Sequence, residues 1–109
     1  MVVFHIVAFK THSSAGLQAL REGFLDLPNV CLHPKTGQPY IKIARGGKQV
    51  STEGKDRGMQ VCFVMEFETE DDLEYYIDKD PVHMEFKNKA GGQWEVLDVV
   101  AMDFNEGVF

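Results

Sequence analysis

Three segments of the chain, residues 2–9, 59–67 and 94–104, are rich in β-branched and aromatic residues. Such residues favour extended strands. Within these segments apolar residues occupy both alternating sets of positions, and a strand of this composition has to be buried on both faces. Any fold for this chain must therefore cover both faces of the sheet that these strands form.

In the first segment, VVFHIVAF, strand alternation predicts two faces. One face would carry Val3, His5, Val7 and Phe9, and the other would carry Phe4, Ile6 and Ala8. His5 is the polar exception in this strand, and a buried polar side chain needs a partner. We expect His5 either to bond to a neighbouring side chain or to face a cavity and orient a substrate.

A helix is predicted between the first two strands. Its apolar residues recur at helical spacing, at Leu17, Leu20, Phe24 and Leu27. Ser13 or Ser14 can cap its start. Pro28 is expected to end it.

Shorter elements complete the pattern. Residues 40–46 alternate as a strand does, Thr69 can cap a second helix, and Pro81 can start a short third one. The order strand, helix, strand, strand, helix, short helix, strand predicts a ferredoxin-like α+β fold with an antiparallel sheet and its helices on one face. We expect one domain over residues 1–109.

The helices of such a fold can cover only one face of the sheet. The second face would remain apolar and exposed in a single chain, which has no spare element to place over it. The simplest cover is another copy of the same chain. We therefore expect a homodimer.

The formal charge of −6 and the isoelectric point of about 5.1 argue against nucleic acid and anionic membranes as partners. No segment reaches the ~20 apolar residues that span a bilayer. The apolar start, residues 1–9, is too short and lacks the basic lead of a signal peptide. Cys31 and Cys62 show no metal or disulfide spacing, so we expect free thiols, Cys62 in the core, and a cytoplasmic protein.

The segment YYIDKDPVHMEF, residues 75–86, carries the residues of most chemical interest. His83 stands among apolar neighbours, and it is either a core histidine bonded to a backbone carbonyl or a general base. Tyr76 is either a packing residue with a satisfied hydroxyl or a donor to a developing oxyanion. A metal held by His5 and His83 is not expected, because no matched carboxylate accompanies them.

Three motifs together resemble the stress-responsive dimeric α/β-barrel domain family. The stretches VVFHIVAFK, GMQVCFVMEFETEDDLEYYI and DPVH follow the order and spacing of its H-x-V-x-F-K strand, its glycine-led strand ending in F-E-S/T, and its Y-x-x-H-P-x-H segment. The resemblance runs from about residue 2 to residue 104. The chain departs from it at Asp80, which replaces the first histidine of H-P-x-H, and by one extra residue between Tyr76 and Pro81.

The resemblance implies a homodimer whose two sheets join into a barrel around a pocket, with no cofactor. Within the family the chain is similar to a plant polyketide cyclase, which uses a tyrosine and a histidine. That similarity implies His83 and Tyr76 as catalytic residues and five substrate-binding residues, His5, Phe24, Phe86, Trp94 and Leu97. The extra residue before Pro81 leaves open whether Tyr75 or Tyr76 faces the pocket.

The function we expect is therefore aldol-type cyclisation, or a related dehydration or decarboxylation, of a small poly-carbonyl substrate. One alternative is a stress-associated barrel without catalysis, whose interior would be filled. Another is a cofactor-independent monooxygenase of small phenols on the same architecture. A cavity of ~300 Å³ or more that reaches His83 would favour an enzyme.

Overall fold

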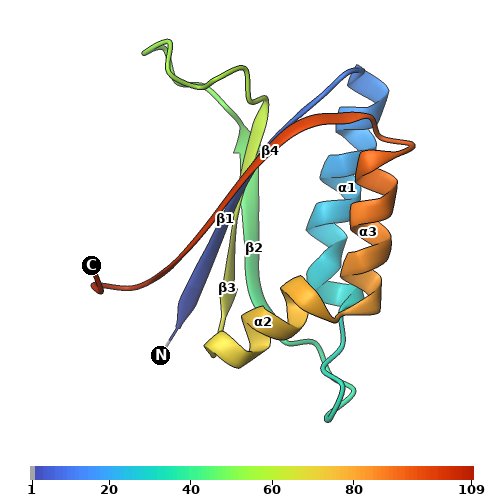
Figure 1. Ribbon diagram of the computed structural model, residues 1–109, viewed down its shortest axis with the longest axis vertical. Coiled ribbons are helices and arrows are strands. Elements are labelled where there is room, and N and C mark those ends of the chain that lie inside the picture. Colours follow the sequence, from blue (N-terminus) through green and yellow to red (C-terminus); the bar gives the residue numbers. More distant parts are fainter. Residues whose placement is uncertain (1) are drawn as a thin grey trace.

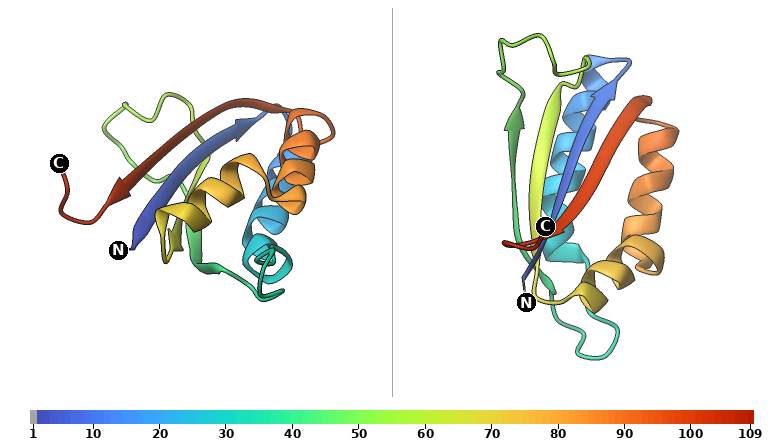
Figure 2. Two further views of the ribbon diagram at one scale, coloured as in Figure 1. Left: turned by 60° about the horizontal axis from the view of Figure 1, so that its bottom comes forward. Right: turned by 60° about the vertical axis from the view of Figure 1, so that its left-hand side comes forward.

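The computed structural model describes residues 2–109, and an antiparallel sheet of four strands forms its centre (Figure 1). The strands are β1 (Val3–Thr11), β2 (Ile41–Lys48), β3 (Val61–Phe67) and β4 (Val96–Asn105), in the order β2-β3-β1-β4. The helices α1 (Ser14–Val30), α2 (Glu70–Asp78) and α3 (Pro81–Gly91) all lie on one side of this sheet (Figures 1 and 2). The arrangement confirms the predicted ferredoxin-like α+β fold.

β1 lies between β3 and β4, and its side chains contribute to both faces of the sheet. His5 of β1 pairs with Met65 of β3 and with Asp103 of β4. Burial alternates along the strand, because the helices cover every second residue, namely Val3, His5, Val7, Phe9 and Thr11. The predicted division of this strand into two faces is confirmed.

Each helix begins at a side chain that caps it. The side-chain oxygens of Ser13, Thr69 and Asp80 accept hydrogen bonds from backbone N–H groups in the first turns of α1, α2 and α3, at 3.0, 3.1 and 2.9 Å. These contacts satisfy donors that have no partner within the helix. Of the two serines considered for α1, Ser13 is the cap.

α1 continues past the proline that was expected to end it. Pro28 lies inside the helix, which ends at Val30, and the backbone N–H of Cys31 donates to the Leu27 carbonyl at 2.9 Å. A proline removes one helical donor, and so close to the helix end the buried side chain of Leu27 still holds the last turn against the sheet. Within residues 2–109 no helix, α1 included, is long and apolar enough to cross a membrane.

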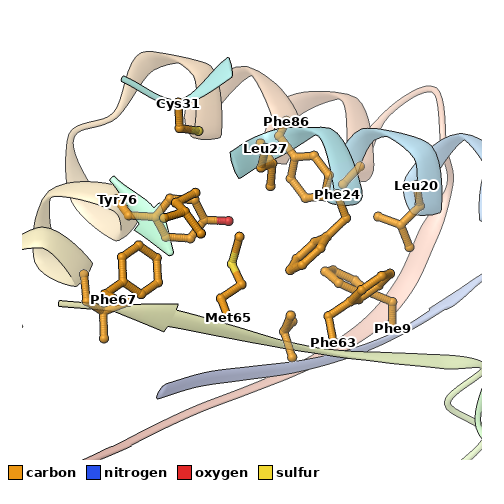
Figure 3. Close-up of a cluster of buried hydrophobic side chains, with 14 of the residues drawn as sticks. Phe9, Leu20, Phe24, Leu27, Cys31, Phe63, Met65, Phe67, Tyr76 and Phe86 are labelled. Carbon is orange, nitrogen blue, oxygen red and sulfur yellow. The ribbon is translucent and has the colours of Figure 1, made fainter. Parts of the chain in front are cut away.

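The core between α1 and the sheet is built largely from phenylalanines (Figure 3). The rings of Phe24 and Phe63 stack with centroids 4.0 Å apart, and Phe9 meets both rings edge-on. Leu20 and Met65 are fully buried beside them. Aromatic pairs of this kind add ~0.5–1.5 kcal/mol each beyond the burial of their area. The cluster therefore fixes the distance between α1 and the sheet.

The face of the sheet turned away from the helices, which we call the outer face, is apolar and exposed. On it Val64, Met102 and Phe104 are 40%, 60% and 41% exposed, and Phe104 stacks on Phe4 with centroids 4.9 Å apart. Cys62, expected in the core, is exposed here, because it shares its strand parity with Val64. A continuous apolar surface of this kind is typical of an interaction site.

Candidate active site

A cavity of about 430 Å³ lies on the helix side of the sheet, with β1 and β4 on one wall and α2 and α3 on the other. A volume in this range suits a small molecule. Most of the lining is apolar and includes Val7, Phe9, Phe24, Phe86, Ala90 and Val99. The polar side chains of the lining are His5 and Asp103 on the strands and Tyr76, His83 and Lys87 on the helices.

His83 projects from the first turn of α3 and is buried. Its Nδ1–H donates to the backbone carbonyl oxygen of Tyr76 at 2.6 Å. Because a carbonyl oxygen can only accept, this contact assigns the proton to Nδ1 and leaves Nε2 as the basic nitrogen. Burial lowers the pKa of His83 from 6.5 to about 4, so the ring is neutral at neutral pH. His83 therefore makes the carbonyl contact expected of a core histidine, and it also keeps an unprotonated nitrogen that could act as a base.

Tyr76, at the end of α2, stacks on His83 with ring centroids 3.7 Å apart. It is fully buried, and among residues 2–109 its hydroxyl has no hydrogen-bond partner. Figure 3 shows this hydroxyl pointing away from α2 toward Met65 and the phenylalanine cluster. Burial raises the pKa of Tyr76, so the phenol remains a donor. A buried hydroxyl without a partner destabilises a fold by ~1–3 kcal/mol, so Tyr76 brings an unsatisfied donor to the wall of the cavity.

His5 is held by a carboxylate on the neighbouring strand. Its Nδ1 lies 2.6 Å from Oδ1 of Asp103, which is directly opposite in the pairing of β1 with β4. A carboxylate can only accept here, so the contact places the proton on Nδ1 and leaves Nε2 to face other groups. The His5 ring meets the ring of Tyr76 edge-on with centroids 5.9 Å apart. His5 thus has the partner that a buried histidine needs, and it also lines the cavity.

Asp103 was not among the residues singled out from the sequence. It shares strand parity with Val99 and Ala101, whose side chains also line the cavity. The sequence does contain one signal for Asp103. A carboxylate at an inward-facing position of an apolar strand needs a buried or half-buried partner. Its pairing with His5 depends on the register between β1 and β4, which the local pattern does not contain.

A second buried polar cluster lies at the start of α3. Asp80, 1% exposed, caps the helix through Oδ1 and accepts the hydroxyl of Tyr40 through Oδ2 at 2.5 Å. Burial and the nearby carboxylate of Asp80 raise the pKa of the Cys31 thiol to about 12, which keeps it protonated. The residue that replaces the first histidine of the family motif thus anchors the helix that carries His83.

The structure brings together five of the seven site residues predicted from the sequence, since His5, Phe24, Tyr76, His83 and Phe86 all line the cavity. Of the two candidate tyrosines it is Tyr76 that does so. Tyr75 instead packs against Tyr40 with ring centroids 5.7 Å apart.

Trp94 and Leu97 do not line this cavity. Trp94 lies behind Phe86, with ring centroids 5.3 Å apart, and fills the space over Gly23 of α1, where a Cβ atom would come within 2.7 Å of the indole. Leu97 is 61% exposed. The family similarity implied Leu97 as a binding residue, but the register of β4 shifts at its start, opposite Lys10 and Thr11, and Leu97 falls at this irregularity.

The position of the cavity also differs from the expectation of a pocket enclosed between two sheets. His83 and Tyr76 are on helices, and all three helices are on one side of the sheet (Figure 2). The cavity therefore forms between sheet and helices of one chain, and the outer face is on the opposite side. Among residues 2–109 no three His, Cys, Asp or Glu side chains converge in a group that could hold a metal ion.

Comparisons with known proteins agree with this architecture. Solved structures of the same fold include a protein of Arabidopsis thaliana at 24% identity, with 98% of this chain and 97% of that chain covered and a TM-score of 0.79. A hydroxynitrile lyase from Passiflora edulis is 18% identical, with 98% and 96% covered and a TM-score of 0.76. A dimeric ferredoxin-like protein from Jannaschia sp. CCS1 is also 18% identical, with 96% and 99% covered and a TM-score of 0.71.

These identities are low, and the likeness to the solved structures concerns the fold. A search of curated proteins finds no significant match. The profile of the stress-responsive A/B barrel domain matches residues 3–106, nearly the whole chain. The chain therefore belongs to the stress-responsive A/B barrel domain family.

Proposed function

We propose that the protein is a cofactor-free enzyme that closes a ring in a poly-carbonyl, polyketide-like substrate by an aldol-type reaction. One observation carries the proposal: His83, whose Nε2 is unprotonated, lines the same cavity as Tyr76, whose buried hydroxyl lacks any partner among residues 2–109. Enolate formation needs a base for the carbon-bound proton and a donor for the carbonyl oxygen. His83 would be the base, and Tyr76 would be the donor.

In the first step Nε2 of His83 takes a proton from a carbon next to a carbonyl group. The electron pair of the broken C–H bond forms the enolate, and its oxygen accepts a hydrogen bond from the Tyr76 hydroxyl. Because this hydroxyl has no other partner to give up, the interaction is gained fully as negative charge grows on the oxygen.

In the second step the enolate carbon bonds to another carbonyl carbon of the same substrate. The oxygen of that second carbonyl becomes an alkoxide and takes the proton from His83, which yields a hydroxyl group and restores the base. A buried imidazolium of low pKa returns its proton readily. The apolar walls, Phe24 and Phe86 among them, would hold the substrate folded with its reacting carbons close together.

His5 would orient the substrate. Asp103 fixes the imidazole with its proton on Nδ1, so Nε2 can accept a hydrogen bond from an enol or hydroxyl of the substrate. An oriented acceptor near Tyr76 complements the donor role of the phenol. We therefore assign His5 to binding and Asp103 to holding His5.

The cavity supports an enzyme over a barrel without catalysis. The non-catalytic alternative predicts a filled interior, whereas about 430 Å³ is open in front of His83. The Passiflora edulis neighbour is a hydroxynitrile lyase, so the fold holds an active site in at least one protein. The residues of this chain, rather than that likeness, carry the assignment.

We further propose that a second copy of the chain covers the outer face. The Jannaschia neighbour is described as dimeric, and the exposed Val64, Met102 and Phe104 form the apolar surface that such a contact would bury. Cys62 would lie within that contact as a free thiol. Free thiols persist in reducing compartments, in keeping with a cytoplasmic homodimer.

The first chemical step can be tested without knowledge of the natural substrate. Nonan-2-one offers a carbonyl group and an apolar chain, and exchange of its α-protons for deuterium can be followed by NMR. We expect the protein to accelerate the exchange, and His83→Asn and Tyr76→Phe each to lower the acceleration about 100-fold or more.

Tyr75→Phe is the matched control, since it removes the neighbouring hydroxyl outside the cavity and should leave the exchange rate unchanged. The fold of each variant is checked by circular dichroism and thermal melting. Equal exchange rates for wild type, His83→Asn and Tyr76→Phe would refute the proposed function.

A further inference from the structure

Lys87 is the one lysine or arginine that lines the cavity among residues 2–109. It lies on α3 one turn after His83, on the same side of the helix. Its Nζ donates to the backbone carbonyl oxygen of Ile77, at the end of α2, over a distance of 3.0 Å. Ile77 also lines the cavity, so this bond holds the ammonium at the cavity wall.

The ammonium of Lys87 has no carboxylate partner among residues 2–109. The contrast is Lys89 on the same helix, which pairs with Glu85 at 3.4 Å. An ammonium has three N–H donors, and the bond to Ile77 uses one.

The acidic group within the cavity does not neutralise Lys87. Asp103 is on the strand wall and is engaged by His5 at 2.6 Å, whereas Lys87 is on the helix wall. The two walls thus differ in charge, and an anionic ligand group would be attracted to the helix wall.

We propose that Lys87 binds a carboxylate of the substrate, so that the cavity takes acids with an apolar body and a carbonyl group some bonds away from the carboxylate. The inference rests on the proposed function, because it places this group relative to His83. Four residues of a helix rise by about 6 Å. A carboxylate at Lys87 would therefore present to His83 a carbon several bonds along the chain, and not the carbon next to the carboxylate.

The test compares two probes of equal chain length, nonanoate and nonan-2-one, which differ in charge at one end. Their dissociation constants are measured by NMR titration, with nonanoate below the concentration at which it forms micelles. We expect wild-type protein to bind nonanoate about fivefold or more tightly than nonan-2-one, and added salt to reduce that preference.

Lys87→Gln should abolish the preference, whereas Lys87→Arg, which keeps the charge, should retain it. Lys89→Gln is the control on the same helix and should leave the preference as in wild type. Equal affinities of the two probes in wild type, or a preference that survives Lys87→Gln, would overturn the assignment of Lys87.

The two proposals fail separately. If Lys87→Gln has no effect while His83→Asn still stops α-proton exchange in nonan-2-one, the carboxylate site is wrong and the catalytic proposal stands. If nonanoate is preferred through Lys87 but no variant alters exchange, the cavity binds acids and the proposed reaction is wrong.

Discussion

Tyr40 and Tyr76 are both buried tyrosines, yet their hydroxyls are in opposite situations. The Tyr40 hydroxyl donates to the carboxylate of Asp80 at 2.5 Å. The Tyr76 hydroxyl has no partner among residues 2–109. Burial raises the pKa of both phenols, and the bond to Asp80 raises that of Tyr40 further.

The difference separates a polar group used for the fold from one left available for a ligand. Tyr40 and Asp80 tie the start of α3 to the segment before β2, and their polar atoms satisfy one another. Tyr76 contributes packing, but its hydroxyl adds a desolvation cost with no compensating bond. Substitutions should therefore affect stability in the first cluster and chemistry in the second.

The largest loss of stability is expected for Asp80→Ala. The change removes the cap of α3 and leaves the buried hydroxyl of Tyr40 without an acceptor, which together should lower the free energy of unfolding by about 3–4 kcal/mol. Urea denaturation measures the change. Asp71→Ala, at an exposed carboxylate in the first turn of α2, is the control, and a loss of less than about 1 kcal/mol for Asp80→Ala would contradict this account.

Acid should weaken the packing of Tyr76 and His83, because it protonates the His83 ring. The pKa of His83 is about 4 in the folded chain, lowered chiefly by burial, and 6.5 when unfolded. Between these values the unfolded chain binds the extra proton, so stability is full above pH 6.5 and declines as the pH falls toward 4, by at most about 3 kcal/mol.

Denaturation of wild type and His83→Asn at a series of pH values measures how much the protonation of His83 lowers stability. Asparagine can keep a donor toward the Tyr76 carbonyl but cannot be protonated, so its profile should be flatter between pH 6.5 and 4. If the two profiles are parallel in that range, His83 is not held neutral by the fold.

Tyr40→Phe should lower stability by about 2 kcal/mol, because it leaves one oxygen of a buried carboxylate without its donor. The change retains the ring and its contacts with Tyr75, so the loss reports the hydrogen bond. α-Proton exchange per folded molecule should stay close to the wild-type rate. An unchanged unfolding midpoint would mean that the bond contributes nothing.

The smallest effect on stability is expected for Tyr76→Phe, within about 0.5 kcal/mol of wild type or slightly stabilising, since it removes a hydroxyl that has no partner. The same variant should lose α-proton exchange. Differential scanning calorimetry measures the stability. A destabilisation as large as that of Tyr40→Phe would show that the Tyr76 hydroxyl has a structural partner after all.

Much of the fold could be predicted because its determinants are local. Alternation in VVFHIVAF grouped His5 with Val3, Val7 and Phe9 on one face, and Thr69 and Pro81 marked helix starts. Pro28 misled because its effect depends on where it stands in the helix, and the buried Leu27 holds the final turn in place.

The site could be predicted only in part, because its remaining features arise from contacts distant in the chain. Asp103 meets His5 through the register of β4 on β1, and Tyr40 meets Asp80 across 40 positions. The family motif placed Tyr76 and His83 near each other. The side of the sheet on which they meet follows from helix packing, which no short motif contains.

β1 contributes to two surfaces at once, with His5, Val7 and Phe9 toward the cavity and Phe4, Ile6 and Ala8 toward the outer face. A single inserted residue near its start would exchange these sets, placing an imidazole among the phenylalanine and methionine of the outer face and aliphatic groups beside Tyr76. Both surfaces would be lost together, although they are on opposite sides of the sheet. A point substitution in β1 can alter the cavity side or the outer face alone. A change in the length of the strand would alter both.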